Sequence, residues 1–173
     1  MREFKDYLRV ILRHEGLYVD NKRDLGMATN LGISLRYIRV RGYDINNDGE
    51  INVKDIKDIT LEKATEIYYN DFWLAMRLEG IENELLKLHL LDMGVNAGTK
   101  TAVKILQRML GITIDGVIGP NTLKAINNYG PNIVADYANA RKGYYLQVIK
   151  KNPNLRVFQK GWLFRVDSTY FKS

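Results

Sequence analysis

The first side chains whose types and spacing could do chemistry are two carboxylates, Glu15 and Asp24. They stand nine positions apart in the segment RHEGLYVDNKRDLGMATN, where a helix-like run gives way to a polar stretch. A helix end followed by a loop that folds back can place such a pair across a cleft. Hydrolysis of a glycosidic bond uses this arrangement, since one carboxyl donates a proton to the leaving oxygen while the other stays ionised.

The neighbours of the two carboxylates suggest a different role for each. Tyr18 and the apolar face of the preceding helix lie near Glu15, so we expect its pKa to rise and the residue to act as the acid. Lys22 and Arg23 lie beside Asp24, and their charges favour its ionised form. Taken alone, however, the spacing favours a simpler interpretation, a helix stop followed by a solvated loop.

Oxygen-bearing side chains also recur in the segment DINNDGEINVKD. Asp44, Asn46 and Asp48 occupy positions 1, 3 and 5 of the calcium-loop pattern, and a glycine follows at position 6 for the sharp turn. The backbone carbonyl of Glu50 falls at position 7, and Asp55 closes the loop at position 12. The pattern predicts a structural Ca²⁺ site, with a metal-free hairpin rich in Asn and Asp as the alternative. No cofactor is expected for the chemistry itself.

The elements that must position these residues are mostly helices. Apolar residues spaced for one helix face, with Thr60 and Pro120 at expected helix starts, predict that most of the chain is helical. Glycine, aspartate and asparagine interrupt the pattern after the first helix, which predicts a loop or a small hairpin there. A short helix or turn is expected over residues 34–42. The other expected helices cover residues 3–15, 60–78, 80–94, 96–110, 119–128, 130–152 and 155–171.

The composition of the 173 residues limits the classes of partner. The chain has no cysteine, which excludes disulfides and thiolate metal sites. Its net charge of +6 favours polyanions such as the bacterial cell wall, but the basic residues form no block typical of nucleic-acid binding. No apolar run predicts a membrane span, and the first residues show no Sec signal. If the protein acts outside the cytoplasm, something else must therefore release it.

The residues from His14 to Ser34 match a known signature. The run HEGLYV…DLGMATNLGIS resembles the glycoside hydrolase 108 family of peptidoglycan muramidases, whose signature reads approximately HEGGYxxxxxDxGGxTxxGIS. The resemblance implies that Glu15 is the catalytic acid and that Asp24 and Thr29 face it. None of the departures from the family pattern removes a proton-carrying group. These departures are Leu17, Leu25 and Met27.

The downstream half resembles the peptidoglycan-binding segment that accompanies this family. The run MGVNAGTKTAVKILQRMLGITIDGVIGPNTLKAI carries the pattern VNxGxxxAVxxLQ…DGxxGPxTLxA. We expect Asn96 and Gly98 to form a tight turn before the next helix, where the Asn96 amide would bind a sugar acetamido group. Aromatic rings, Trp162 among them, are candidates for stacking on sugars, although core packing is the alternative for Trp73 and Trp162. The candidate substrate-binding residues are Tyr18, Asn30, Tyr43, Trp73 and Asn96.

The sequence therefore predicts a mainly α, lysozyme-like fold with a short loop or β-hairpin after the first helix. Residues 1–93 are expected to form a catalytic part, and residues 94–173 a peptidoglycan-binding-like helical part packed into the same globule. The predicted function is hydrolysis of the β-1,4 bond between N-acetylmuramic acid and N-acetylglucosamine by a monomeric phage or prophage endolysin. A non-catalytic, calcium-stabilised wall-binding protein is the alternative. Inversion and retention both stay open, because the outcome depends on the separation of the carboxylates.

Overall fold

Helices make up most of the structure, which is a computed structural model. It describes residues 2–15 and 28–171, except for the side chain of Glu15. The chain divides into two units. The hairpin unit comprises Leu8–Tyr68, and the helical unit comprises Met1–Tyr7 and Tyr69–Ser173. Helix α1 (Phe4–Glu15) contributes residues to both. The prediction of a mainly helical, lysozyme-like fold with a small hairpin after the first helix is confirmed.

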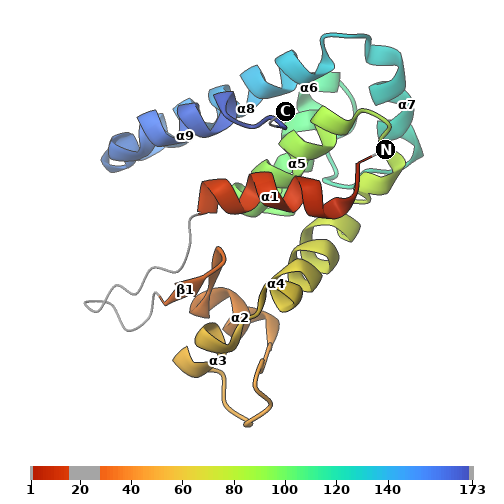
Figure 1. Cartoon of the computed structure of the whole chain (residues 1–173). Helices are drawn as coiled ribbons and strands as arrows, with labels where there is room; N and C mark the ends of the chain where they lie inside the picture. The colour runs from red at the N-terminus through yellow and green to blue at the C-terminus, as the bar shows by residue number, and fades with distance from the viewer. Residues whose placement is uncertain (1, 16–27, 172–173) are drawn as a thin grey trace. The chain divides into compact units, whose positions relative to one another are not determined.

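In the hairpin unit, a two-stranded antiparallel sheet is followed by short helices (Figure 1). Leu31 and Gly32 form the turn of the sheet, and both have the positive φ, 49° and 78°, that a tight hairpin turn requires. Ser34 then caps the next helix, because its Oγ accepts the N–H of Tyr37 at 3.2 Å. The segment LGIS is therefore a turn, a buried Ile33 and a helix cap. The elements are β1 (Thr29–Asn30), β2 (Ile33–Ser34), α2 (Leu35–Arg41), α3 (Val53–Asp58) and α4 (Leu61–Tyr68).

The helix predicted over residues 60–78 starts as expected but does not continue as one α-helix. The Oγ1 atom of Thr60 accepts the N–H of Lys63 at 3.2 Å, which is the predicted cap. The chain then changes to a π-helix, η1 (Tyr69–Leu74), and later to a 3₁₀ turn, η2 (Leu78–Gly80). Periodicity does not predict this change, because π and 3₁₀ turns differ from an α-helix in hydrogen bonding rather than in residue type.

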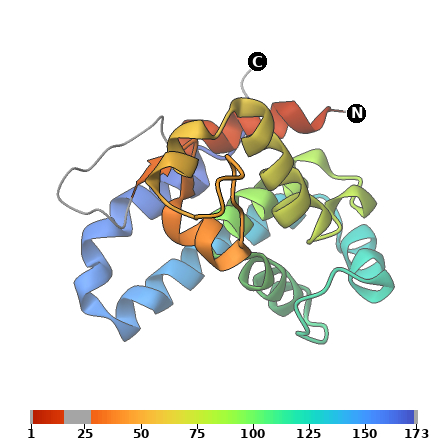
Figure 2. The same cartoon turned by 90° about the horizontal axis from the view of Figure 1, so that it is seen from below.

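In the helical unit, α5 packs against α6 and α8, and α8 packs against α9 (Figure 2). Helix α5 is buried continuously from Leu86 to Gly94, as expected for the central helix of a core. The segment expected to be helical over residues 80–94 is helical from Glu84, and the helix continues to Ala97 and meets α6 at Gly98, where φ is 94°. The elements are η1, η2, α5 (Glu84–Ala97), α6 (Thr99–Leu110), α7 (Pro120–Tyr129), α8 (Ile133–Lys151), η3 (Pro153–Phe158) and α9 (Gln159–Asp167).

The two functional parts predicted from the sequence share one helix in the structure. Residue 93 lies within α5, and the two structural units divide between Tyr68 and Tyr69. The assignment of catalysis to residues 1–93 and of wall binding to residues 94–173 stays a prediction. Over residues 2–15 and 28–171, no helix has both the length and the apolar composition that crossing a bilayer requires.

A charged cluster lies in the core of the helical unit. Asp92 on α5 and Arg141 on α8 are fully buried and form an ion pair. The other carboxylate oxygen of Asp92 accepts from Nε of Arg165 at 2.9 Å, and Thr169 donates to the first oxygen at 3.3 Å. On the far side of the pair, Nη1 of Arg141 lies 2.8 Å from Nδ1 of His89. The cluster therefore ties α5 to α8, to α9 and to the residues after α9.

His89 makes the stability of the helical unit depend on pH. Its burial, together with the positive charge of Arg141, lowers its pKa to about 3. Because Arg141 can only donate, Nδ1 of His89 must accept, which requires the neutral ring. The unfolded chain binds a proton at this residue below a pH of about 6.5, whereas the folded protein does not do so until pH nears the lower value.

We therefore expect the free energy of unfolding to decrease as pH falls from 7 to 5. With a slope approaching about 1.4 kcal/mol per pH unit below the unfolded pKa, the contribution of His89 over this range is roughly 2 kcal/mol. Urea unfolding at the two pH values measures it. The variant His89→Gln should lack this contribution, and an equal pH dependence in both proteins would contradict a neutral, buried His89.

Candidate active site

The predicted catalytic residues lie at the end of α1 and at the start of the sheet. Glu15 is the last residue of α1, and its backbone is helical. Thr29 is the first residue of β1, pairs with Ser34 on β2 and is half-buried. The side chain of Glu15 and the whole of Asp24 and Tyr18 lie outside the described residues, as do the three departures from the family signature. Thr29 is therefore the catalytic candidate whose surroundings the structure describes.

Asn30, predicted to bind substrate, holds the hairpin in place. Its side-chain amide donates to the carbonyl oxygen of Ile56 at 2.9 Å and to that of Ile59 at 3.1 Å. These carbonyls stand in α3 and just after it, at two buried residues. From α4, the hydroxyl of Tyr68 donates to the carbonyl of Leu31 in the hairpin turn at 3.0 Å. The hairpin that carries Thr29 is thus fixed to α3 and α4.

We expect Asn30→Ala to lower the free energy of unfolding by about 1–3 kcal/mol, because two carbonyl groups lose their donor. Chemical denaturation measures the loss, and Asn128→Ala on an exposed turn of α7 is the matched control, expected to change stability by less than about 0.5 kcal/mol. A variant that keeps its stability but has a raised KM would instead support direct contact of Asn30 with substrate.

Tyr43 lies between α2 and the predicted calcium loop. It is half-buried, and the guanidinium carbon of Arg41 lies 5.8 Å from the centre of its ring. Its N–H donates to the carbonyl of Ile38 at 2.9 Å, which closes the end of α2. The stacking of Tyr43 on a sugar stays a prediction, and its partly exposed ring is compatible with it.

The acidic residues of the predicted calcium loop fold the loop around its own backbone. Asp44 accepts the N–H groups of Asp48 at 3.3 Å and Gly49 at 2.8 Å, and Gly49 has the positive φ, 88°, of a sharp turn. Asn46 accepts the N–H of Asp48 at 3.0 Å, and Asp48 accepts that of Glu50 at 3.0 Å. Three of the predicted ligands therefore sit on one tight loop.

Asp55, the predicted closing ligand, is fully buried at the start of α3. Burial alone would raise its pKa, but hydrogen bonds from the N–H groups of Asn52, Ile45 and Asn46 outweigh burial and hold the pKa below its ordinary value. The ionised carboxylate thus joins the end of the loop to its beginning. Within the described ranges, no three His, Asp or Glu side chains are grouped closely enough to hold a metal.

Trp73 stands in an aromatic cluster of the helical unit. Its exposed fraction is 6%, and its ring meets those of Phe4 and Tyr7 edge-on, with centroids 5.4 and 4.7 Å apart. One part of Trp73 lines a pocket of about 360 Å³ that Phe4, Tyr69 and the buried Lys87 also line. The stacking of Trp73 on a sugar stays a prediction. Because the ring is otherwise covered, a sugar could contact it only from this pocket. The sequence did not point to Lys87, because one lysine in a helical pattern carries no signal.

Asn96 lies in the last turn of α5 rather than in the tight turn expected from the sequence. Its side-chain oxygen accepts the hydroxyl proton of Tyr145 on α8 at 2.7 Å. The ring of Tyr145 stacks on that of Trp162 on α9, with centroids 5.0 Å apart. Asn96 is exposed, so its N–H groups can still reach a sugar carbonyl, and this role stays a prediction.

Two family models match the chain. One, described as glycosyl hydrolase 108, matches residues 8–98, and the other, described as a predicted peptidoglycan domain, matches residues 101–167. Among solved structures, SagA from Brucella abortus is 30% identical and has a TM-score of 0.77, over 96% of this chain and 90% of that chain. No curated protein matches. The matches to the two models meet beside Gly98, where α5 ends and α6 begins.

Proposed function

The chain belongs to the glycosyl hydrolase 108 family, and from this membership we propose that it is an N-acetylmuramidase. The family makes it a glycoside hydrolase, and the second matched model makes peptidoglycan its partner. The bond that it would cleave is the β-1,4 bond between N-acetylmuramic acid and N-acetylglucosamine. The observation that supports the proposal is the run from His14 to Ser34, which resembles the family signature and in which Glu15 ends α1 and Thr29 begins β1.

In the proposed mechanism, Glu15 donates its proton to the glycosidic oxygen. Asp24 stays ionised, and together with Thr29 it positions water or stabilises the positive charge that develops on the sugar. Catalysis of this kind needs groups held by rigid elements. The strand that carries Thr29 meets this need, because Asn30 and Tyr68 fix it to α3 and α4.

The net charge of +6 supports an anionic polymer as substrate, because a basic surface attracts it over long distances. That the enzyme is a monomeric phage or prophage endolysin, held in the bacterial cytoplasm until its release, stays a prediction from the sequence.

The alternative is a wall-binding protein without catalysis, and one assay separates the two. The enzyme is expected to lower the turbidity of a purified peptidoglycan suspension with release of soluble fragments. A non-catalytic binder would sediment with the peptidoglycan and release nothing. Sedimentation without soluble fragments would therefore overturn the proposal in favour of the alternative.

We also propose a structural role for Ca²⁺ in the loop from Asp44 to Asp55. Its side-chain oxygens are of the kind that Ca²⁺ prefers, and Lys54, at 3.9 Å from Asp48, is the one basic side chain that the described structure pairs with them. Asp44, Asn46 and Asp48 would supply side-chain oxygens, Glu50 its carbonyl and Asp55 the closing carboxylate. The carboxylate of Asp55 already accepts hydrogen bonds from backbone N–H groups. To bind the ion, it must either coordinate Ca²⁺ while keeping these hydrogen bonds or break them and turn toward the ion.

Removal of Ca²⁺ is expected to lower the melting temperature. At a concentration 100 times the dissociation constant, a bound ion stabilises the fold by about 2.7 kcal/mol. Titration calorimetry should show binding of one ion, and Asp44→Asn should weaken it, whereas Asp58→Asn at an exposed position outside the loop should not. Absence of binding heat, with a melting temperature that a chelator leaves unchanged, would refute the Ca²⁺ site.

A further inference from the structure

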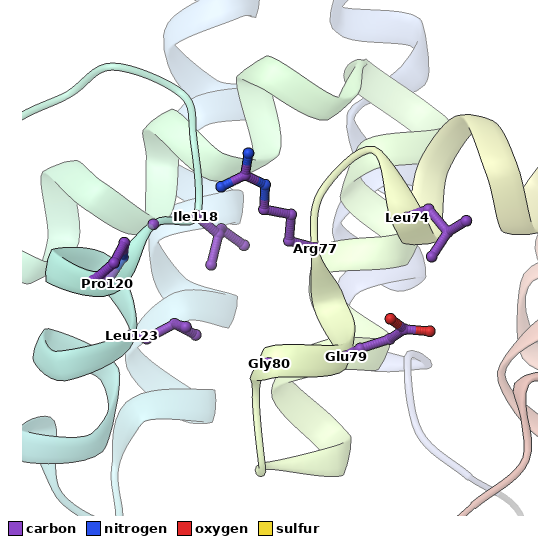
Figure 3. A pocket seen from close by; sticks show the side chains of 8 residues that line it. Leu74, Arg77, Glu79, Gly80, Ile118, Pro120 and Leu123 are labelled. Carbon is purple, nitrogen blue, oxygen red and sulfur yellow. The ribbon is translucent and has the colours of Figure 1, made fainter.

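A pocket of about 400 Å³ opens on the helical unit between two segments that the two family models match separately. One wall is the chain from Leu74 to Gly80, which includes η2. The other wall is the chain from Ile118 to Leu123, which leads into the first turn of α7 (Figure 3). Neither wall carries a residue that the sequence pointed to as a binding residue.

The wall before α7 is held in shape by a buried glutamine. The side-chain amide of Gln107 on α6 donates to Oδ1 of Asp115 at 2.6 Å and to the carbonyl of Val117 at 3.0 Å. Its oxygen accepts the N–H of Gly116 at 2.8 Å. These contacts explain the LQ…DG part of the family-like pattern. They also hold this wall of the pocket in place before a ligand binds, so that binding does not incur the entropic cost of ordering it.

The opposite wall presents one cation. Arg77 has a left-handed backbone, with φ 55° and ψ 40°, a conformation that residues with side chains rarely adopt and that is concentrated at functional sites. Its side chain is exposed and extends toward Ile118 in Figure 3. Within residues 2–15 and 28–171, its guanidinium has no ion pair or hydrogen bond, so it is available to an anion.

The acid of the same wall does not neutralise Arg77. Glu79 accepts the hydroxyl proton of Tyr69 at 2.7 Å, and in Figure 3 its carboxylate points away from Ile118, Pro120 and Leu123. The side of the pocket that faces α7 therefore combines one positive charge with an aliphatic wall.

This combination fits one component of peptidoglycan better than the other. Ile118, Pro120 and Leu123 supply aliphatic contact, with Leu74 across the pocket, and no aromatic ring is among the lining residues to stack on a sugar. The peptide component of the wall carries methyl side chains and free carboxylates. We propose that the pocket binds this peptide stem, with Arg77 pairing with a carboxylate and the aliphatic wall covering the methyl groups. The proposal rests on peptidoglycan as the partner and adds a peptide site to a glycan-cleaving enzyme.

Binding of two probes to the Glu15→Gln protein tests the proposal without hydrolysis. The probes are the synthetic pentapeptide L-Ala-γ-D-Glu-L-Lys-D-Ala-D-Ala and chitotetraose, a glycan without peptide. Arg77→Gln removes the charge. Gly119→Leu fills the pocket, since a Cβ at Gly119 meets nothing within 4 Å and its φ of −108° suits any residue. Arg156→Gln, at an exposed position on η3, is the control for the loss of a charge.

We expect each pocket variant to weaken pentapeptide binding at least about 10-fold in titration calorimetry, with Arg156→Gln and chitotetraose binding unchanged. Failure of the pentapeptide to bind, or binding that neither pocket variant weakens, would overturn the proposal. Weakened chitotetraose binding would instead identify a glycan site. Failure of the muramidase proposal would be a separate result. It would be seen in the new reducing ends that the wild-type enzyme creates in peptidoglycan, not in the binding of probes to the pocket variants.

Discussion

Replacing Glu15 by Gln is expected to lower the rate of peptidoglycan hydrolysis by about 10²–10⁴-fold, the usual contribution of a general acid. The amide keeps the shape of the side chain but cannot transfer a proton to the glycosidic oxygen. A 10³-fold loss corresponds to roughly 4 kcal/mol of transition-state stabilisation. Initial rates of soluble fragment release from purified peptidoglycan measure it, at enzyme concentrations that keep the slow variant within range.

The matched control is Glu3→Gln. Glu3 precedes α1, is 70% exposed at its side chain and pairs with Lys5, so the same chemical change there should leave the rate unchanged. Both variants should keep the melting temperature of the wild type, since a loss of rate through unfolding would not report on proton transfer. Equal rates for the wild type and Glu15→Gln would refute the assignment of Glu15 as the acid.

Replacing Asp92 by Asn is expected to lower the free energy of unfolding by about 3–5 kcal/mol, because it leaves the fully buried Arg141 without a counter-ion. The neutral His89 on the other side of the guanidinium cannot replace the lost charge. For a chain of this length, the loss corresponds to a decrease in melting temperature of roughly 6–20 °C. Calorimetry and urea unfolding at pH 7 measure both quantities.

Asp167→Asn is the control for an ion pair at the surface. Asp167 pairs with Lys142 at 2.5 Å, but its side chain is 62% exposed, so the loss should lie within about 0–1 kcal/mol. Similar losses for the two variants would contradict the claim that burial makes the Asp92–Arg141 pair important for stability.

Features that depend on neighbouring residues could be predicted from the sequence. Pro120 starts α7, Gly111 ends α6 in the left-handed conformation, and Thr60 caps α4, each as its residue type implies. These features are local, because a cap acts on the backbone within one turn. The π-helix at Tyr69–Leu74 is also local but has no signature in residue type, and it was missed.

Partnerships between distant residues could not be predicted. Asp92 meets Arg141, 49 positions away, and Arg165, 73 positions away, and nothing in their local patterns marks them as partners. Asn30 was predicted as a binding residue because it lies within the run from His14 to Ser34 that resembles the family signature. The structure adds that the amide donates to two carbonyls of the α3 region. The left-handed Arg77 likewise became a candidate only through its backbone angle and its place in a pocket.

The most direct test of the central claim is mass spectrometry of the reducing ends that the wild-type enzyme creates in purified peptidoglycan. Reduction with borohydride before digestion of the fragments marks each new end. An N-acetylmuramidase creates new ends at N-acetylmuramic acid, and this result is predicted. New ends at N-acetylglucosamine, or intact glycan chains with cleaved amide bonds, would contradict the proposed function.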